Sequence, residues 1–504
     1  MNRISSRSQS GRNASVLFTL VWMLAISIAM IAPAQAQSNL VKLSTDTFTN
    51  SDSEHKTEVE PDTFAWGSTI VSAFQVARVP NGGGADVGFA TSRDGGKTWS
   101  SGYLPGLTNH YKGGSFTAAS DAAVAYDAKH GQWLISTLPI INNQGEAVAT
   151  SRSTDGITWG KPIIVDQSGS DDKNWITCDN TTSSPHYGNC YTEWDEPGLG
   201  DLIFMSTSTD GGKTWSPGKN TADSAAGLGG QPLVQPNGTV VVPINGFGGM
   251  IAFTSTDGGK SWGSSTLIAV QNFRGEDGGL RSPGLPSAAV DGAGKVYVVW
   301  PDCSFHSGCS TDDIVLSTST DGKTWTQPAR IPIDSINSTV DHFIPGLGVD
   351  IKTSGKTAHL ALTYYYYPVA NCGNSCKLNV GFTISHDGGK TWTAGKNLAG
   401  PMQLSWLPQS QNGLMVADYL AVAYSKGNPF GVFAVAKAPS GGKFNEAMYT
   451  TKSPLLASLD EPRFSSKGEK PVHNAKGKYV WKFYDDDGQY PIPPSKQIRP
   501  SKQK

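Results

Sequence analysis

Carboxylic acids at the starts of several predicted strands are the candidates in this sequence for acid–base chemistry. A carboxyl group can deliver a proton to a leaving group or remove one from a nucleophile when its pKa lies near the working pH. The structural alternative is that such groups cap strands and accept backbone N–H bonds. We take Glu60, Asp172 and Asp418 as the catalytic candidates. The other acids in comparable places are Asp62, Asp121 and, in a loop, Glu276.

Aromatic and cationic side chains accompany these acids. Trp175, His342 and Tyr419 combine ring faces with polar groups, which suits sugars because sugars have apolar faces and polar edges. Arg274 and Arg281 lie in the segment FRGEDGGLRSPGLP, and a guanidinium binds a carboxylate through two parallel hydrogen bonds. We therefore expect Trp175, His342, Arg274 and Arg281 to bind a glycan. Ordinary core packing is the alternative for the aromatic residues.

A short motif that occurs six times indicates which elements hold these side chains. The first copy reads SRDGGKTW from Ser92 to Trp99, and two later copies are one residue shorter. Asp-Gly supplies a turn with positive φ, the carboxylate accepts backbone N–H groups, and the tryptophan packs back over the turn. The motif therefore predicts a β-hairpin. Its aspartates are Asp94, Asp155, Asp210, Asp257, Asp321 and Asp387.

Most copies of the motif follow a short strand with alternating apolar residues, such as residues 85–91. Equivalent strands are expected at 202–207, 250–254, 314–318 and 379–384. Successive motif aspartates are 47 to 66 residues apart, which leaves room for four short strands in each unit. One four-stranded blade per repeat is therefore predicted.

The two ends of the repeat array predict how it closes. A further unit at residues 417–437 has the strand pattern but lacks the motif, and residues 40–45 are a strand without a partner upstream of the first unit. Pairing of these two segments would protect the sheet edges. The sequence therefore predicts an all-β, seven-bladed β-propeller of four-stranded antiparallel blades, closed by the N-terminal strand. Six blades are the alternative.

The six motifs resemble the Asp boxes, also called BNR repeats, of the sialidase superfamily, over nearly the whole chain after residue 36. The resemblance implies a propeller with the Asp boxes on outer hairpins and any catalytic residues around the central axis. The superfamily also includes propellers without enzymatic activity, so the fold by itself implies no reaction.

The resemblance also implies roles for particular residues. Sialidases use a tyrosine nucleophile activated by a glutamate, an aspartate as general acid and base, and an arginine cluster for the substrate carboxylate. Tyr419 opens the last unit's inner strand, where similar sialidases carry their nucleophile, and Asp418, Glu60 and Asp172 are the candidate acids.

The arginine cluster is incomplete in this interpretation. The family's Arg-Ile-Pro triplet matches Arg330-Ile331-Pro332, but this copy follows the fifth Asp box and is expected on an outer strand. Arg78 precedes Val79-Pro80 at the end of a second strand, so we also place it outside the site. Arg274 and Arg281 remain, one fewer than the family uses.

Residues 1–36 indicate export. Arginines without an acid precede an apolar stretch from Val16 to Ala32, and Ala34-Gln35-Ala36 suits a signal peptidase. An uncleaved membrane anchor is the alternative. We expect a signal peptide at 1–36, the propeller at 37–462 and a Lys/Pro-rich tail at 463–504. The cysteines of an exported chain should form local disulfides, and the expected pairs are Cys178–Cys190, Cys303–Cys309 and Cys372–Cys376.

Composition and missing motifs exclude several other classes. The chain has 40 Lys and Arg and 42 Asp and Glu, so it lacks the excess of positive charge that is typical of nucleic-acid-binding proteins. No C-x-x-C occurs, the histidines are scattered, and Asp485-Asp486-Asp487-Gly488 fits a solvated turn, so neither metal nor cofactor is predicted. P-loop, dinucleotide and hydrolase motifs are absent in a suitable context.

The sequence thus favours an exported, sialidase-like propeller that binds or processes a glycan at its axial face. A true exo-α-sialidase is one alternative. The other is a non-catalytic scaffold that contacts a partner protein through the loops at 303–309 and 372–376.

Overall fold

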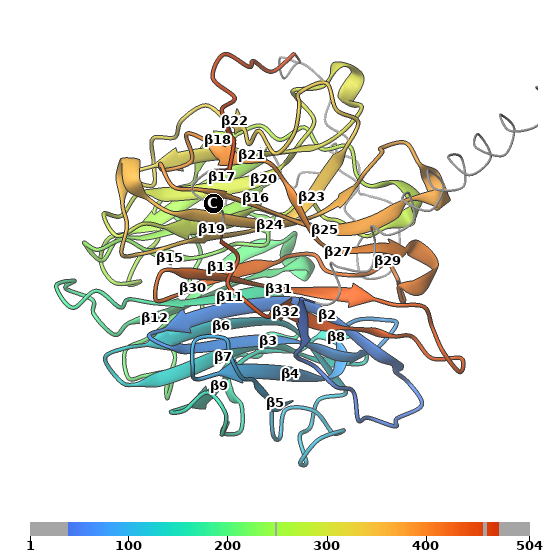
Figure 1. Ribbon diagram of the computed structural model, residues 1–504. Coiled ribbons are helices and arrows are strands. Elements are labelled where there is room, and N and C mark those ends of the chain that lie inside the picture. The colour runs from blue at the N-terminus through green and yellow to red at the C-terminus, as the bar shows by residue number, and fades with distance from the viewer. Residues whose placement is uncertain (1–38, 247–248, 457–460, 473–504) are drawn as a thin grey trace, which may run out of the picture.

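The computed structural model describes residues 39–246, 249–456 and 461–472. These residues form antiparallel sheets arranged around a common axis, as in a β-propeller (Figure 1). Helical structure in the described residues consists of short 3-10 turns: η1 Pro197–Leu199, η2 Asp277–Gly279, η3 Ser307–Cys309, η4 Gly355–Thr357, η5 Gly373–Ser375 and η6 Leu404–Trp406. The prediction of an all-β protein is confirmed.

The first half of the described chain contributes two meanders that share one sheet. The strands of the first meander are β2 Glu54–Trp66, β3 Thr69–Arg78, β4 Gly84–Ser92 and β5 Ser100–Tyr103. Those of the second are β6 Ala118–Asp127, β7 Gln132–Ile141, β8 Gln144–Gly145, β9 Val148–Ser153 and β10 Ile163–Asp166. A single pair, Gly84 with Ala119, joins them into a nine-stranded sheet.

Three further sheets follow in chain order. The first is three-stranded: β11 Asp172–Cys178, β12 Cys190–Glu196 and β13 Leu202–Ser208. The next is five-stranded: β14 Gly227–Leu228, β15 Leu233–Val234, β16 Val240–Gly246, β17 Gly249–Ser255 and β18 Thr266–Ala269. The third is four-stranded: β19 Ser287–Val290, β20 Val296–Asp302, β21 Asp313–Ser319 and β22 Ala329–Arg330.

Two more large sheets follow, and the second of them contacts the first sheet of the chain. One contains β23 Asp341–Val349, β24 Leu360–Tyr367, β25 Lys377–Ser385 and β27 Lys396–Gln403. The other contains β30 Ala421–Ser425, β31 Asn428–Ala436, β32 Glu446–Thr451 and β1 Leu40–Lys42. Two small pairs complete the set: β26 Trp392–Thr393 with β33 Arg463–Phe464, and β28 Gln409–Ser410 with β29 Gly413–Leu414.

The predicted number of blades is not confirmed. Among the described residues, five sheets have at least four strands, which matches neither seven blades nor the six-bladed alternative. Two features account for the difference. The Gly84–Ala119 pair merges two meanders into one sheet, and the β11–β13 sheet lacks a regular fourth strand, because Lys219 meets Met205 only in an isolated bridge.

The predicted closure by the N-terminal strand is confirmed. β1 pairs antiparallel with β32, and Leu40 lies opposite Thr451. Figure 1 shows the consequence, since the blue N-terminal strands and the orange C-terminal strands lie side by side. The innermost strands contact one another in a closed order, β2, β6, β11, β15, β19, β23, β30 and again β2. The starts of these strands therefore meet around one axis.

Apolar cores lie between neighbouring sheets. Between the first two meanders, Val71 and Phe89 pack against Val124, Ile135 and Trp159, all of them buried. In the same region the Phe89 and Trp159 rings are 5.8 Å apart. Alternating inward residues of one sheet thus meet those of the next, which fixes the spacing of the sheets around the axis.

The Asp boxes form the turns that the sequence predicts, each directly after the third strand of its unit. In the last copy, Asp387 Oδ1 accepts the Thr391 backbone N–H at 2.8 Å and the Ser385 hydroxyl at 2.9 Å. The Trp392 indole donates to the Gly389 carbonyl at 3.0 Å. Burial raises the pKa of Asp387, but the hydrogen bonds from Thr391 and Ser385 outweigh it and hold the pKa below its ordinary value.

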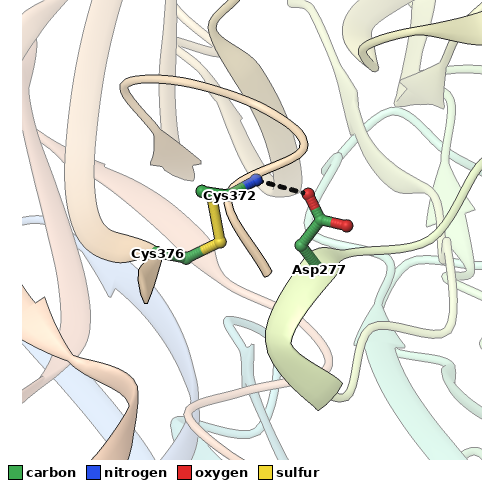
Figure 2. Close-up of side chains that lie close together, drawn as sticks. All are labelled: Asp277, Cys372 and Cys376. Carbon is green, nitrogen blue, oxygen red and sulfur yellow. Dashed lines mark hydrogen bonds between the residues drawn. A yellow bond between two sulfur atoms is a disulfide. The ribbon is translucent and has the colours of Figure 1, made fainter. Parts of the chain in front are cut away.

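The predicted disulfides Cys178–Cys190, Cys303–Cys309 and Cys372–Cys376 are all present. The first joins facing residues of β11 and β12, as expected for one hairpin. Figure 2 shows the third, where Asp277 of η2 accepts the Cys372 backbone N–H at 3.0 Å. This bond ties the loop that carries Arg274 and Arg281 to the disulfide-closed loop.

The predicted signal peptide at 1–36 lies outside the described residues, and so does most of the predicted tail at 463–504. The first two tail residues form β33, which pairs with β26 beside the last Asp box. Within the described part of the chain, no helix has the length and apolar character needed to cross a bilayer.

Asp387→Ala is expected to lower the free energy of unfolding by about 1–2 kcal/mol, the usual cost of deleting a carboxylate that caps backbone N–H groups. Chemical denaturation monitored by tryptophan fluorescence measures the loss. Lys390→Ala is the matched control, because Lys390 is an exposed residue of the same turn. Equal stability of the two variants would contradict a structural role for the Asp-box carboxylate.

Candidate functional site

A repeated irregularity at the start of the innermost strands turns charged side chains toward the axis. The register of β2, β6 and β11 shifts near residues 60, 121 and 173. Glu60, Asp121 and Lys173 there have positive φ angles of 55°, 46° and 42°. A bulge residue in this conformation leaves the in–out alternation of its strand, and a non-glycine residue there costs about 1 kcal/mol or more. Each of these three adjacent strands thus contains one residue with a strained backbone.

A pocket of about 60 Å³ opens beside these bulges. Its walls come from the first two meanders, the start of β11 and the loops around residues 281 and 411–415. The charged and amide residues that line it are Glu60, Gln75, Arg78, Asn81, Asp121, Asn143, Asp171, Asp172, Arg281 and Gln411. We call this hollow the axial pocket.

Arg281 and Asp418 form a two-pronged ion pair beside the axial pocket. The Arg281 Nε–H group lies 2.9 Å from both Asp418 carboxylate oxygens, and Nη2 donates to Oδ2. Burial lowers the pKa of Arg281, but the carboxylates of Asp418 and Glu60 outweigh it and raise the pKa above its ordinary value. Asp418 therefore holds the guanidinium charged and in a fixed orientation.

Lys173 lies over an aromatic pair and beside Asp121, which lines the axial pocket. Its Nζ is 3.2 Å from Asp121 Oδ1, 3.6 Å from the centre of the Tyr419 ring and 4.8 Å from that of Trp175. The two rings meet edge to face with centroids 5.1 Å apart. A desolvated cation over two rings is attracted by their π faces as well as by the carboxylate. The rings of Trp175 and Tyr419 thus stabilise the Lys173 ammonium group in this position.

The Tyr419 hydroxyl is enclosed. The side chain is 2 % exposed, and the phenol oxygen has no hydrogen-bond partner among the described residues. Burial raises the pKa of Tyr419 well above its ordinary value, and the carboxylates of Glu60 and Asp121 raise it further. In this structure the phenol is neutral and does not line the axial pocket.

Glu60 is a buried acid at the centre of the site. Gln75 donates a hydrogen bond to its carboxylate. Burial raises the pKa of Glu60 well above its ordinary value, and the negative charges of Asp418 and Asp121 act in the same direction. Glu60 therefore binds its proton more tightly than a free glutamate does, which suits a group that exchanges protons with a substrate.

Arg78 is a site residue that the sequence interpretation placed elsewhere. It ends β3, as expected, but its side chain is 1 % exposed and lines the axial pocket. Its Nε and Nη2 atoms have no hydrogen-bond partner among the described residues. Burial and the nearby Arg281 charge lower the pKa of Arg78 to about 10. Its exclusion from the axial site was wrong, because Ala77, directly before it in β3, has a positive φ of 54°, and a residue in this conformation interrupts the alternation of its strand.

Asp172 lines the axial pocket, and its Oδ1 accepts the Lys173 backbone N–H at 2.8 Å. Asp62 lies deeper, where its Oδ2 accepts the Val124 backbone N–H at 2.6 Å. Burial raises the pKa of Asp62 to about 6. Asp62 thus ties β2 to β6, the strand-linking role that was the alternative for these acids.

Arg274 lies in a separate cluster. It donates to Asp341 Oδ2 at 2.6 Å and to Asn371 Oδ1 at 3.2 Å. Glu276, beside it, has a pKa well above the ordinary value because of burial and the Asp341 charge. The structure therefore separates Arg274 and Glu276 from the axial pocket, although Arg281 lies only seven residues after Arg274.

His342 lies in a buried network around β22. Its Nδ1 is 3.9 Å from Asp313 Oδ1 and its Nε2 is 3.7 Å from Asp334 Oδ2. Arg330 also pairs with Asp313, at 2.8 Å, and lies on the outer strand where the sequence interpretation placed it. His342 does not line the axial pocket, so the structure does not bring it together with Arg281.

Two family models match this chain. The BNR repeat-like domain matches residues 181–348, and the BNR/Asp-box repeat matches residues 383–394. The search of curated proteins finds no match.

Several solved structures are similar. The Hadza microbial sialidase Hz136 is 16 % identical over 80 % of this chain and 66 % of its own, with a TM-score of 0.40. The intramolecular trans-sialidase from Ruminococcus gnavus is 13 % identical over 85 % and 99 %, with a TM-score of 0.40. The NanB sialidase from Streptococcus pneumoniae is 14 % identical over 82 % and 70 %, with a TM-score of 0.40. The assignment of this chain to a family depends on the two matching repeat models and not on these structures.

Glu193→Gln is expected to flatten the dependence of stability on pH. Glu193 is fully buried below Lys173, and burial raises its pKa to about 8. The folded chain therefore keeps a proton that the unfolded chain releases above about pH 4.3, so stability falls as the pH rises from there towards the folded pKa. Denaturation at several pH values in this window should show a shallower decline for the variant. Asp52→Asn, at an exposed acid, is the control, and a variant slope equal to that of wild type would contradict the expectation.

Proposed function

Because this chain belongs to the BNR-repeat β-propellers of the sialidase superfamily, we propose that it binds an acidic glycan in the axial pocket. The observation that carries the proposal is the pair of guanidinium groups, Arg78 and Arg281, that line one pocket together with Glu60 and Asp121. Guanidinium groups recognise a sugar carboxylate, and carboxyl groups bind sugar hydroxyls.

The electrostatics of the two arginines favour an anion between them. Arg281 lowers the pKa of Arg78, so the two positive charges repel each other across the pocket. Asp418 compensates Arg281, whereas Nε and Nη2 of Arg78 have no partner in the described part of the chain. A carboxylate bound there would satisfy these donors and relieve the repulsion.

The size of the axial pocket fits a substituent of a sugar. About 60 Å³ admits a carboxylate group and its nearest atoms, and the sugar ring would then lie over the rim. Asp172 and Gln411 at the rim offer hydrogen-bonding groups to the ring hydroxyls.

Arg78→Met is expected to weaken binding of a carboxylate-bearing glycan at least tenfold, since a buried charged hydrogen bond contributes about 1.5–3 kcal/mol. A glycan array with the wild-type protein identifies the ligand, and calorimetry with that glycan compares the variants. Arg93→Met, at an exposed arginine of the first Asp box, is the control and should bind like wild type. An array without acidic glycans among the wild-type ligands would refute the proposal.

The second candidate function is hydrolysis of a sialoside, favoured by the position of Tyr419. Glu60 is the strongest charge that acts on its phenol, which is the glutamate–tyrosine pair that sialidase chemistry uses. The Glu60 carboxylate would take the phenol proton as the tyrosine oxygen attacks the anomeric carbon, while a second carboxylic acid protonates the leaving oxygen. That acid, now a carboxylate, would then take a proton from the water that releases the sugar, and the phenol would regain its proton from Glu60. Lys173 has to move off the Tyr419 ring for this reaction.

Sialidase activity predicts turnover of a fluorogenic sialoside by wild type and a loss of at least about 100-fold in Tyr419→Phe. Tyr424→Phe is the matched control, because Tyr424 lies in β30 and its hydroxyl also has no partner among the described residues. Circular dichroism confirms that both variants fold. Absence of turnover in wild type, or equal activity of the two variants, would exclude the hydrolase and leave glycan binding.

We also propose that residues 1–36 are a signal peptide and that the protein acts after export. The three disulfides support this location, since disulfides persist in oxidising compartments. The propeller would then span 37–462, with 463–504 as a tail.

A further inference from the structure

Three carboxylates gather where β10, the start of β11 and the end of β12 meet. Asp166 ends β10, Asp171 immediately precedes β11, and Glu196 ends β12. Each offers one oxygen, and these three oxygens lie within 4.8 Å of one another. The Ser168 hydroxyl lies between two of them, 2.9 Å from Asp171 Oδ1 and 3.1 Å from Glu196 Oε1. We call this group the β10–β12 cluster.

A buried oxygen without a partner distinguishes this cluster from an ordinary group of surface acids. Asp171 is 2 % exposed, and its Oδ2 atom has no hydrogen-bond partner among the described residues. Leaving such an oxygen unsatisfied costs about 1–3 kcal/mol, and more when it carries charge. The strongest neighbouring charges are also negative, from Asp166, Glu196 and Glu146. Among the described residues, no lysine, arginine or histidine forms an ion pair with these three acids.

We propose that the β10–β12 cluster is a calcium-binding site. Calcium takes carboxylate, hydroxyl and carbonyl oxygens at about 2.3–2.6 Å, so two ligands of one ion lie at most about 5 Å apart. The three carboxylate oxygens already meet that limit, at 4.8 Å or less. An ion among them would neutralise the mutual repulsion of the acids and give the buried Asp171 carboxylate a positive charge beside it.

The donor set favours calcium over magnesium. Magnesium demands near-ideal octahedral geometry and usually keeps several of its waters. Calcium accepts irregular arrangements of six to eight oxygens. Asp166 is half-buried and Ser168 is exposed, so water has access and can fill the remaining positions.

A bound ion would stabilise one wall of the axial pocket. Asp171 contributes both to the cluster and to the pocket lining. Its backbone N–H donates to the Gly145 carbonyl at 3.2 Å, and Gly145 lines the pocket as well. The ion would therefore fix the loop at 167–171, which connects β10 to β11. Calcium binding in this proposal requires no glycan, so it does not depend on the proposed function.

The test is calorimetry with calcium chloride alone on the full chain freed of metal by chelation, together with thermal unfolding with and without calcium. Wild type should bind one ion and unfold at a higher temperature in its presence. Asp166→Asn and Glu196→Gln should each weaken the affinity at least tenfold, because each removes one anionic ligand. Asp52→Asn should bind calcium like wild type.

The two variants keep the test independent of a folding defect, because Asp166 is half-buried and both substitutions preserve side-chain size. Three results would overturn the proposal. The first is neither heat nor a thermal shift from wild type at about 5 mM calcium, a concentration above the range of ordinary protein sites. The second is calcium binding by both folded variants that is as tight as that of wild type. The third is tighter binding of magnesium than of calcium.

Discussion

The pairing of β1 with β32 is the constraint on which the axial site depends. It joins the N-terminal strand to the last sheet and closes the order of inner strands from β2 through β30 back to β2. Only in a closed ring do Asp418 before β30, Glu60 of β2 and Lys173 of β11 lie around one axis, although they are far apart in the sequence. The site residues are therefore assembled by closure of the ring, which brings single residues from separate units together, and not by a short sequence motif.

The charges at the axis are stable because they compensate one another over a short range. Asp418 forms an ion pair with Arg281, and Asp121 forms one with Lys173. The rings of Tyr419 and Trp175 also contact the Lys173 ammonium group. Glu60 has no ion-pair partner among the described residues, and burial raises its pKa and that of Tyr419 well above their ordinary values. An ion pair of this kind contributes little to stability once desolvation is counted. Its value lies in the fixed positions that it gives to Arg281 and Lys173.

The sequence was sufficient to predict features that depend on local chemistry. The Asp-box turns, the disulfides and the closing strand each follow from a few neighbouring residues, and the structure confirms them. Position around the ring is different, because it depends on contacts between units. Arg274 and Arg281 share one segment, yet Arg274 pairs with Asp341 and Arg281 with Asp418. Arg78 escaped detection because the positive φ of Ala77 interrupts the alternation of β3 directly before it, which the sequence does not reveal.

The Asp-box turns depend on residues of their own unit, whereas the axial residues depend on residues of other units. This difference explains why the fold is easier to infer than the function. The aspartate of each Asp box is exposed or half-buried. Burial acts to raise its pKa, but hydrogen bonds from the hydroxyl and backbone of the same turn outweigh it and lower the pKa to about 2 in Asp210 and Asp257. The same solution can be repeated in every unit because each turn needs only its own residues. At the axis, burial raises the pKa of Glu60 and Asp62, and groups from different units pair with one another, as Arg281 does with Asp418. Repetition would place like charges together there, so the axial residues must differ from unit to unit, and that difference is what gives the pocket its chemistry.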